Sequence, residues 1–124
     1  MYALLLAWFA ITSAEVIDLN QPSPTWRSVA PMSIARRQVN ATLLPDGTVL
    51  VTGGTSGPGF NNATTPVYPA ELWDPATNLW REVAPVSSAR AFARLVVAHR
   101  GIYQVSGVGS DEHADPTVER FVWR

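Results

Sequence analysis

The sequence predicts an all-β fold built from small antiparallel sheets, and three observations support this prediction. Ten prolines and eight glycines are spread over all 124 residues, between short apolar runs of strand length. No stretch of about a dozen residues has the spacing of an amphipathic helix. A long block of sequence also occurs twice, which indicates a repeated structural unit.

The repeat is clearest in the block WRSVAPMSIAR at positions 26–36. It returns as WREVAPVSSAR at positions 80–90, an offset of 80 − 26 = 54 residues, with eight of eleven positions identical. VLVTGG at 49–54 returns as IYQVSG at 102–107, and AEVID at 14–18 returns as AELWD at 70–74 and as VERF at 118–121. A period of about 50 residues with four strand-like runs is typical of β-propellers, whose blades are four-stranded antiparallel sheets.

The strands of one unit are expected at residues 38–44, 48–52, 70–74 and 79–83. Pro45-Asp46-Gly47 forms the turn between the first two, because glycine accepts a positive φ, and residues 75–78 form the turn between the last two. The next unit is expected to place strands at 91–98, 102–106 and 117–122, with a turn at 99–101.

These residues resemble the kelch repeat, in which an arginine opens the first strand, a glycine pair ends the second, an acidic residue lies in the third and a tryptophan in the fourth. The match is nearly full over 36–80 and partial over 90–123, where Ser106 replaces the first glycine. RQVNATLLPDG at 37–47 is similar to the kelch propeller of galactose-oxidase and glyoxal-oxidase-like proteins. The resemblance implies an incomplete propeller of about two to three blades. The end of a preceding blade would occupy 1–32, a full blade 33–86 and a truncated blade 87–124.

Two residue types have a predicted packing role in such blades. Glycine at the end of the second strand lets a neighbouring backbone or ring approach closely. Trp26 and Trp80 are expected to fill the wedges between blades, where a large ring buries the most area.

Residues 1–14 contain an apolar run from 2 to 11, which is too short to span a bilayer. We interpret it as a buried strand leading into residues 14–18. The alternative is a signal peptide, favoured by the small residues Thr12 and Ala14 but lacking a basic start. Localisation is therefore open, with secretion as one option.

The stretch TGGTSGPG at 52–59 fits the T-G-x-x-x-G-x-G opening of short-chain dehydrogenases. That motif works only where a strand, a turn and a helix follow one another. Residues 60–69 contain two prolines and poor helix formers, and the chain lacks the lysine of the dehydrogenase Tyr-x-x-x-Lys pair. An NAD(P)-binding reductase is therefore a remote alternative.

The composition excludes several kinds of site. A formal net charge of −1 gives no electrostatic reason to expect nucleic acid or an anionic membrane as partner. The chain has no cysteine, so it contains no disulfide, thiolate metal site or cysteine nucleophile.

The oxidase resemblance implies a copper radical enzyme with a cysteine-linked tyrosine, a second tyrosine and two histidines. Without cysteine this cofactor cannot form within the chain, and His99 and His113 lie in no copper-ligand motif. We therefore expect no catalytic residue, no metal site and no cofactor here. The acidic loop at 111–115 is expected to be solvated rather than to bind a metal.

Arg36, Arg37, Arg90 and Arg94 are the candidate binding residues. The resemblance places such arginines near the mouth of the propeller channel, where they would contact acidic peptides or small anions. Guanidinium groups bind carboxylates through two parallel hydrogen bonds. The favoured alternative is a structural role, in which each arginine pairs with a blade glutamate such as Glu71 or Glu119.

The sequence thus predicts a scaffold or binding module from a larger kelch protein, with an unidentified protein or small acidic ligand as partner. A part of a galactose-oxidase-like enzyme, with its catalytic residues outside this chain, is the second hypothesis. Because propeller closure hides sheet edges, self-association through exposed blade edges is also expected.

Overall fold

The computed structural model describes residues 10–57, 65–99 and 101–122, which contain nine strands and no helix. The strands are β1 (Glu15–Ile17), β2 (Trp26–Ser28), β3 (Asn40–Leu43), β4 (Val49–Thr52), β5 (Ala70–Asp74), β6 (Leu79–Val83), β7 (Arg94–Ala98), β8 (Gly101–Val105) and β9 (Val118–Val122). This confirms the all-β prediction. No helix long and apolar enough to cross a bilayer occurs in the described ranges.

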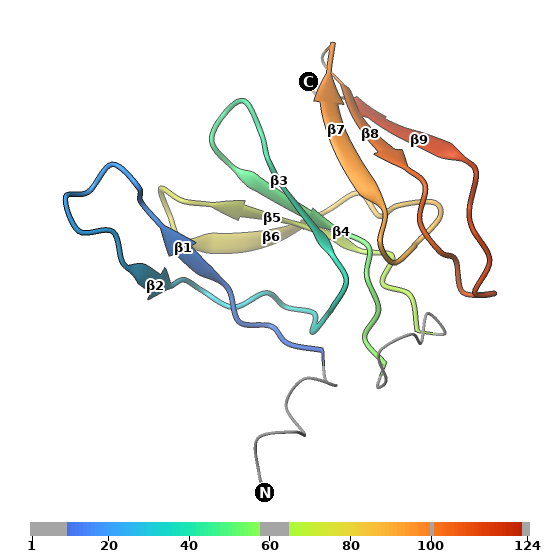
Figure 1. Cartoon of the computed structure of the whole chain (residues 1–124), viewed down its shortest axis with the longest axis horizontal. Helices are drawn as coiled ribbons and strands as arrows, with labels where there is room; N and C mark the ends of the chain where they lie inside the picture. The colour runs from blue at the N-terminus through green and yellow to red at the C-terminus, as the bar shows by residue number, and fades with distance from the viewer. Residues whose placement is uncertain (1–9, 58–64, 100, 123–124) are drawn as a thin grey trace, which may run out of the picture.

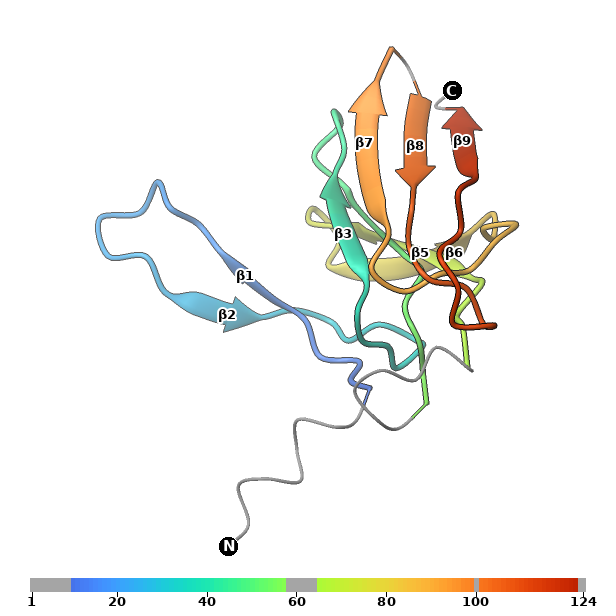
Figure 2. The ribbon, with the colours of Figure 1, turned by 45° about the vertical axis from the view of Figure 1, so that its right-hand side comes forward.

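All strand pairs are antiparallel between chain neighbours, and they form three separate sheets. The sheets have the orders β1-β2, β3-β4-β5-β6 and β7-β8-β9. The four-stranded sheet lies in the middle, with β1-β2 at one end of the molecule and β7-β9 at the other (Figures 1 and 2). The chain therefore forms an open arc of propeller-type blades, in which the middle sheet is one complete blade.

Seven predicted strands are present, and the two inner ones begin later than predicted. β3 begins at Asn40 rather than at residue 38, and β7 begins at Arg94 rather than at residue 91. The cause is local, because Gln38 and Phe92 have φ angles of 56° and 59°, which extended strands do not allow.

The same strand register recurs in all three sheets. Trp73 pairs with Trp80 across β5 and β6, as Ile17 pairs with Trp26 across β1 and β2. Val49 pairs with Trp73 across β4 and β5, as Ile102 pairs with Phe121 across β8 and β9. Equivalent positions can therefore be compared between the sheets, residue by residue.

The core lies between the middle sheet and the β7-β9 sheet. It consists of the buried residues Leu44, Leu50, Ala70, Leu72 and Ile102, with Val83, Leu95 and Phe121 packed against them. Strands β4 and β5 supply most of this cluster, because both are central in the sheet and covered on both sides.

The two repeated tryptophans differ in their surroundings. Trp80 is half-buried, lies 6.5 Å from Trp73 between ring centroids, and donates its indole N–H to the carbonyl of Ala30 at 2.6 Å. Trp26 is 65% exposed, so the prediction that it fills a wedge is wrong for the described part of the chain. Its face of the β1-β2 sheet has no blade against it among the described residues.

The two remaining sequence predictions have different outcomes. Strand β4, which carries the dehydrogenase-like glycines, is followed by antiparallel β5. That order contradicts the strand–turn–helix context of a dinucleotide site, so the NAD(P) alternative is wrong. The apolar run at 2–11 lies mostly outside the described residues; within them, Ile11 is exposed and forms a single bridge to Arg36.

Candidate functional site

Arg36 precedes β3 and directs its guanidinium group into the interior, where the side chain is 0% exposed. One terminal nitrogen donates to the Oε2 atom of Glu71 at 2.7 Å. The other donates to the carbonyl oxygens of Gly53 at 3.2 Å and Pro69 at 3.1 Å. Arg36 therefore ties the lead-in of β3 to the end of β4 and the start of β5.

Arg90 repeats this arrangement in the next blade, also with a side chain at 0% exposure. Its Nη1 atom donates to the carbonyls of Ser106 at 3.1 Å and Thr117 at 2.9 Å, which are the positions equivalent to Gly53 and Pro69. Its Nη2 atom donates to the hydroxyl of Thr117 and forms an ion pair with Asp115 at 3.3 Å. Both arginines are buried, and each joins segments of its blade through hydrogen bonds and an ion pair.

The repeated glutamates hold the segment that enters each blade. Glu71 accepts the backbone N–H of Ser33 at 2.7 Å, and Glu119 accepts those of Ser87 and Ser88 at 2.6 and 3.3 Å. The structural prediction is confirmed for the pair of Arg36 and Glu71. For Arg90 it is wrong, because the two serine amides occupy the Glu119 carboxylate and the partner of Arg90 is Asp115.

Asp115 is the acidic group that the second blade adds to this network. The Ser88 hydroxyl donates to its carboxylate at 2.5 Å, and the Thr117 hydroxyl and backbone N–H donate at 2.6 and 2.9 Å. Hydrogen bonds from Ser88 and then Thr117, with a smaller contribution from Arg90, lower the pKa of Asp115 from 3.8 to about 2. The carboxylate therefore stays ionised at neutral and mildly acidic pH.

The two segments that enter the inner strands, residues 36–40 and 90–94, lie side by side and are here called the lead-in segments. The backbone N–H of Phe92 donates to the carbonyl of Gln38 at 3.4 Å, and the Asn40 side chain donates to the carbonyl of Ala93. The backbones of the two segments that carry the four candidate arginines are therefore adjacent.

The four arginines fall into two classes. Arg36 and Arg90 are enclosed by protein atoms. Arg94 is exposed at the start of β7, and Arg37 is half-buried beside Gln38. Of the four, Arg94 is therefore the most accessible to solvent, and Arg37 is partly accessible.

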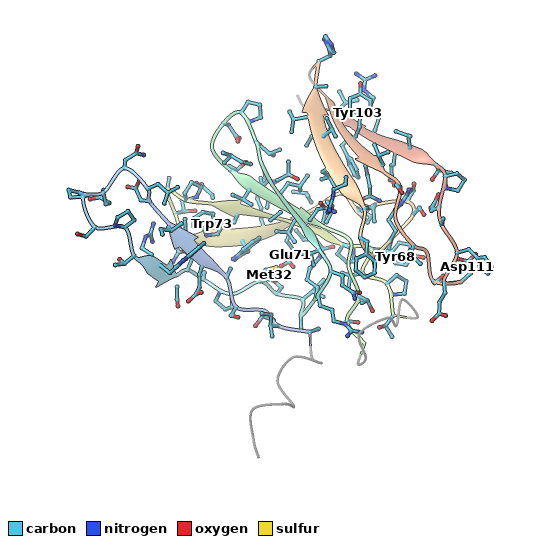
Figure 3. All side chains as sticks on the ribbon, in the orientation of Figure 1. Met32, Tyr68, Glu71, Trp73, Tyr103 and Asp111 are labelled. Atoms are coloured by element: carbon cyan, nitrogen blue, oxygen red, sulfur yellow. The ribbon has the colours of Figure 1, made fainter. Side chains whose placement is uncertain are left out.

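The loops around Tyr68, Ser88 and Asp111 enclose a polar hollow of about 360 Å³ beside the Arg90 network. Tyr68, Asp111 and His113 contribute to its walls, and Figure 3 shows Tyr68 and Asp111 on loops beyond the strand ends. Glu71 lies inside the arc in the same view. The hollow is open to solvent at His113, which is exposed.

The residues present do not fit a copper site. Among the described residues no three histidine, aspartate or glutamate side chains are placed to hold a metal ion. His99 and His113 are both exposed, on the β7-β8 turn and the β8-β9 loop, and the chain has no cysteine.

The solved structures that are similar to this chain over most of its length include the following two proteins. A fungal alcohol oxidase of the AA5 family, solved in complex with copper, matches 82% of this chain with a TM-score of 0.70 and 25% identity. YjhT matches 79% of it with a TM-score of 0.66 and 20% identity. The chain is an arc of β-propeller blades.

The arc corresponds to a small part of each of these proteins, 22% of the alcohol oxidase and 28% of YjhT. No protein-family model matches the chain. The likeness therefore concerns the fold of the propeller, and the activity of the whole oxidase does not follow from it.

Sequence reasoning overlooked Gln104 and expected Asp115 to lie in a solvated loop, which is wrong because its carboxylate is mostly buried and pairs with Arg90. Gln104 is fully buried and donates its side-chain amide to the Ser88 carbonyl at 3.0 Å. The role of Asp115 was indicated by the sequence, because the pattern Asp-x-Thr occurs twice. Asp46 accepts both hydrogen bonds of Thr48, as Asp115 accepts those of Thr117. Gln104 had no such pattern, because its counterpart in the preceding blade is Val51.

Proposed function

We propose that this arc is a kelch-type scaffold and binding module that presents Arg37 and Arg94 to a carboxylate ligand, either a small acid or an acidic peptide. The observation that supports the proposal is the difference in burial and in bonding partners among the four arginines. Arg36 and Arg90 fasten the blades, whereas Arg94 is exposed and Arg37 is partly accessible on the adjoining lead-in segment.

The surroundings of the two arginines suit such a ligand. Guanidinium groups bind carboxylates through paired, charge-assisted hydrogen bonds. Phe92 precedes Arg94 by two residues, and its backbone N–H donates to the carbonyl of Gln38, next to Arg37; its side chain is 50% exposed and its φ is 59°. Left-handed non-glycine residues are enriched at binding sites, and an exposed ring adds apolar contact beside the charge.

The test is titration of the chain with a dicarboxylate, glutarate, and with a glutamate-rich peptide, followed by NMR chemical shifts. Arg37→Ala and Arg94→Ala are each expected to weaken binding about tenfold, since a charge-assisted pair contributes roughly 1.5–3 kcal/mol. Arg27→Ala, on exposed β2, is the matched control and should leave binding unchanged. Equal weakening by all three variants, or no shift with either ligand, would contradict the proposal.

The second candidate function is a scaffold part of an AA5-like copper oxidase whose catalytic residues lie outside this chain. The similarity to the fungal alcohol oxidase favours it, at 25% identity over 82% of this chain. On this hypothesis the chain alone, supplied with copper(II) and a primary alcohol, should produce no hydrogen peroxide. Peroxide formation above that of copper alone would show a complete oxidase site within the chain and contradict it.

A further inference from the structure

The lead-in segment of the second blade, residues 90–94, is attached to the β8-β9 loop, residues 106–117. Ala91 and Val108 each donate a backbone N–H to the carbonyl of the other, at 3.0 and 2.9 Å. Arg90 donates to two carbonyls of the same loop, those of Ser106 and Thr117. The loop therefore lies along the start of the segment that carries Arg94.

The Asp115 carboxylate joins the loop to this segment through its two oxygen atoms. Oδ1 accepts the hydroxyl and the backbone N–H of Thr117, both within the loop. Oδ2 accepts the hydroxyl of Ser88 at 2.5 Å and lies 3.3 Å from the Nη2 atom of Arg90. The Asp115 side chain is only 16% exposed, so solvent screens these contacts little. One side chain thus connects the β8-β9 loop to the residues that begin the lead-in segment.

The middle blade holds its arginine differently. Val67 occupies the position of Asp115, since both residues donate the backbone N–H to a glycine carbonyl two residues after β4 or β8, at 3.0 and 2.9 Å. A valine side chain accepts no hydrogen bond, and Arg36 pairs instead with Glu71 on β5. The arginine of the second blade is therefore paired with a loop, whereas the arginine of the middle blade is paired with a strand.

The lead-in segment of the second blade contains a strained residue. Phe92 has a φ of 59°, in the left-handed region, and a non-glycine residue keeps such a conformation only where its surroundings restrain it. Its backbone N–H makes a long bond of 3.4 Å to the carbonyl of Gln38. The remaining restraint comes from the neighbouring bonds, that of Asn40 to Ala93 on one side and those of the β8-β9 loop on the other. Arg94 follows Phe92 by two residues, so its direction depends on the same bonds.

We propose that Asp115 is a positioning residue for the carboxylate site, which fixes the direction of Arg94 without touching the ligand. This role rests on the proposed function, because the ligand is the carboxylate proposed for Arg37 and Arg94. When the bonds of Asp115 are lost, Phe92 should relax towards negative φ, and Arg94 should hold its binding direction for only a fraction of the time. The apparent affinity for the carboxylate falls in proportion to that fraction.

The test begins with Asp115→Asn, which removes the charge and keeps the size of the side chain. In the free chain it should change the HN–Hα coupling constant of Phe92, which reports φ. It should also weaken glutarate binding, by no more than the roughly tenfold loss expected for Arg94→Ala, because Asp115 acts through Arg94. Ser88→Ala removes one bond of Asp115 and should act in the same direction with a smaller effect. It decides the matter if circular dichroism shows that D115N has lost its strands.

Asp46→Asn is the matched control. Asp46 accepts both hydrogen bonds of Thr48, as Asp115 accepts those of Thr117, but it lies in the turn between β3 and β4. The variant should leave the Phe92 coupling constant and glutarate binding unchanged.

A double-variant cycle separates positioning from a general loss of stability. In the Arg94→Ala background, D115N should cause no further loss of glutarate binding. An equal loss in both backgrounds, an unchanged Phe92 coupling constant in folded D115N, or the same effects from D46N would overturn the proposal. A wild type that binds neither glutarate nor the glutamate-rich peptide would contradict the proposed function instead. The coupling constants of the free chains would then still decide whether Asp115 fixes the segment that carries Arg94.

Discussion

A buried arginine is tolerated only when its charge and its donors are matched, and Arg36 meets this condition through Glu71 and two backbone carbonyls. The ion pair therefore specifies how the lead-in of β3 meets β4 and β5. Desolvation of both groups offsets much of their attraction, so the pair fixes an arrangement more than it adds stability.

Replacing Arg36 alone should destabilise the fold far more than replacing Arg36 and Glu71 together. Arg36→Met leaves the buried Glu71 carboxylate without its ion-pair partner. It is expected to lower the free energy of unfolding by about 3–5 kcal/mol. The double variant R36M/E71L removes both charges and should recover part of that loss. Urea unfolding of the three proteins measures this, with exposed Arg81→Met as control. A loss below about 1 kcal/mol for R36M, the range of a surface pair, would contradict a structural role.

At the scale of strands, the Gly53-Gly54 pair shows why β4 ends where it does. Both residues have positive φ, at 67° and 85°. A Cβ atom on Gly53 would lie 2.6 Å from the carbonyl oxygen of Arg90, in the neighbouring blade. The end of β4 is therefore a point of close approach between two blades, as the sequence predicted for this glycine.

Alanine in place of Gly53 should lower the free energy of unfolding more than alanine in place of the turn glycine Gly47. Gly47 also has a positive φ, of 86°, but a Cβ there meets nothing within 4 Å. Gly47→Ala should therefore lose only the conformational term of about 1–2 kcal/mol. Gly53→Ala should lose that amount plus the cost of moving Arg90 of the next blade. Thermal unfolding compares the two variants, and equal losses would show that the close approach is not a constraint.

The strands were predictable because period-two apolar runs and turn residues are local signals. The positive φ of Gln38 and Phe92 was not, since neither residue type favours it and the contact between the two joins residues that are far apart in the sequence. The four arginines of the predicted binding set lie on the two lead-in segments, and their binding role stays a prediction. Their division into buried and accessible members was not predicted, although the repeat pairs Arg36 with Arg90 and leaves Arg37 and Arg94 outside the repeated block.

At the scale of the whole molecule, the three sheets differ in how much of their surface is covered by a neighbouring sheet. The middle sheet has a sheet against each face, whereas β1-β2 has two short strands and β2 is exposed at every position. The amides of β4 and β5 are enclosed by the core, which contains Leu50 and Leu72. Local opening should therefore begin at β1-β2 and reach the middle sheet last.

Native-state hydrogen exchange tests this order on dilute protein, where association between copies is minimal. Amides of β4 and β5 should exchange only through global unfolding, with the full dependence on denaturant, because they open with the core. Amides of β1 and β2 should exchange through a smaller opening with a weak dependence on denaturant. Leu50→Ala should accelerate exchange in the middle sheet and leave exchange in β1-β2 nearly unchanged. If all strands shared one opening free energy, the two-stranded end would belong to the same cooperative unit as the central blade, and this description of the arc would be wrong.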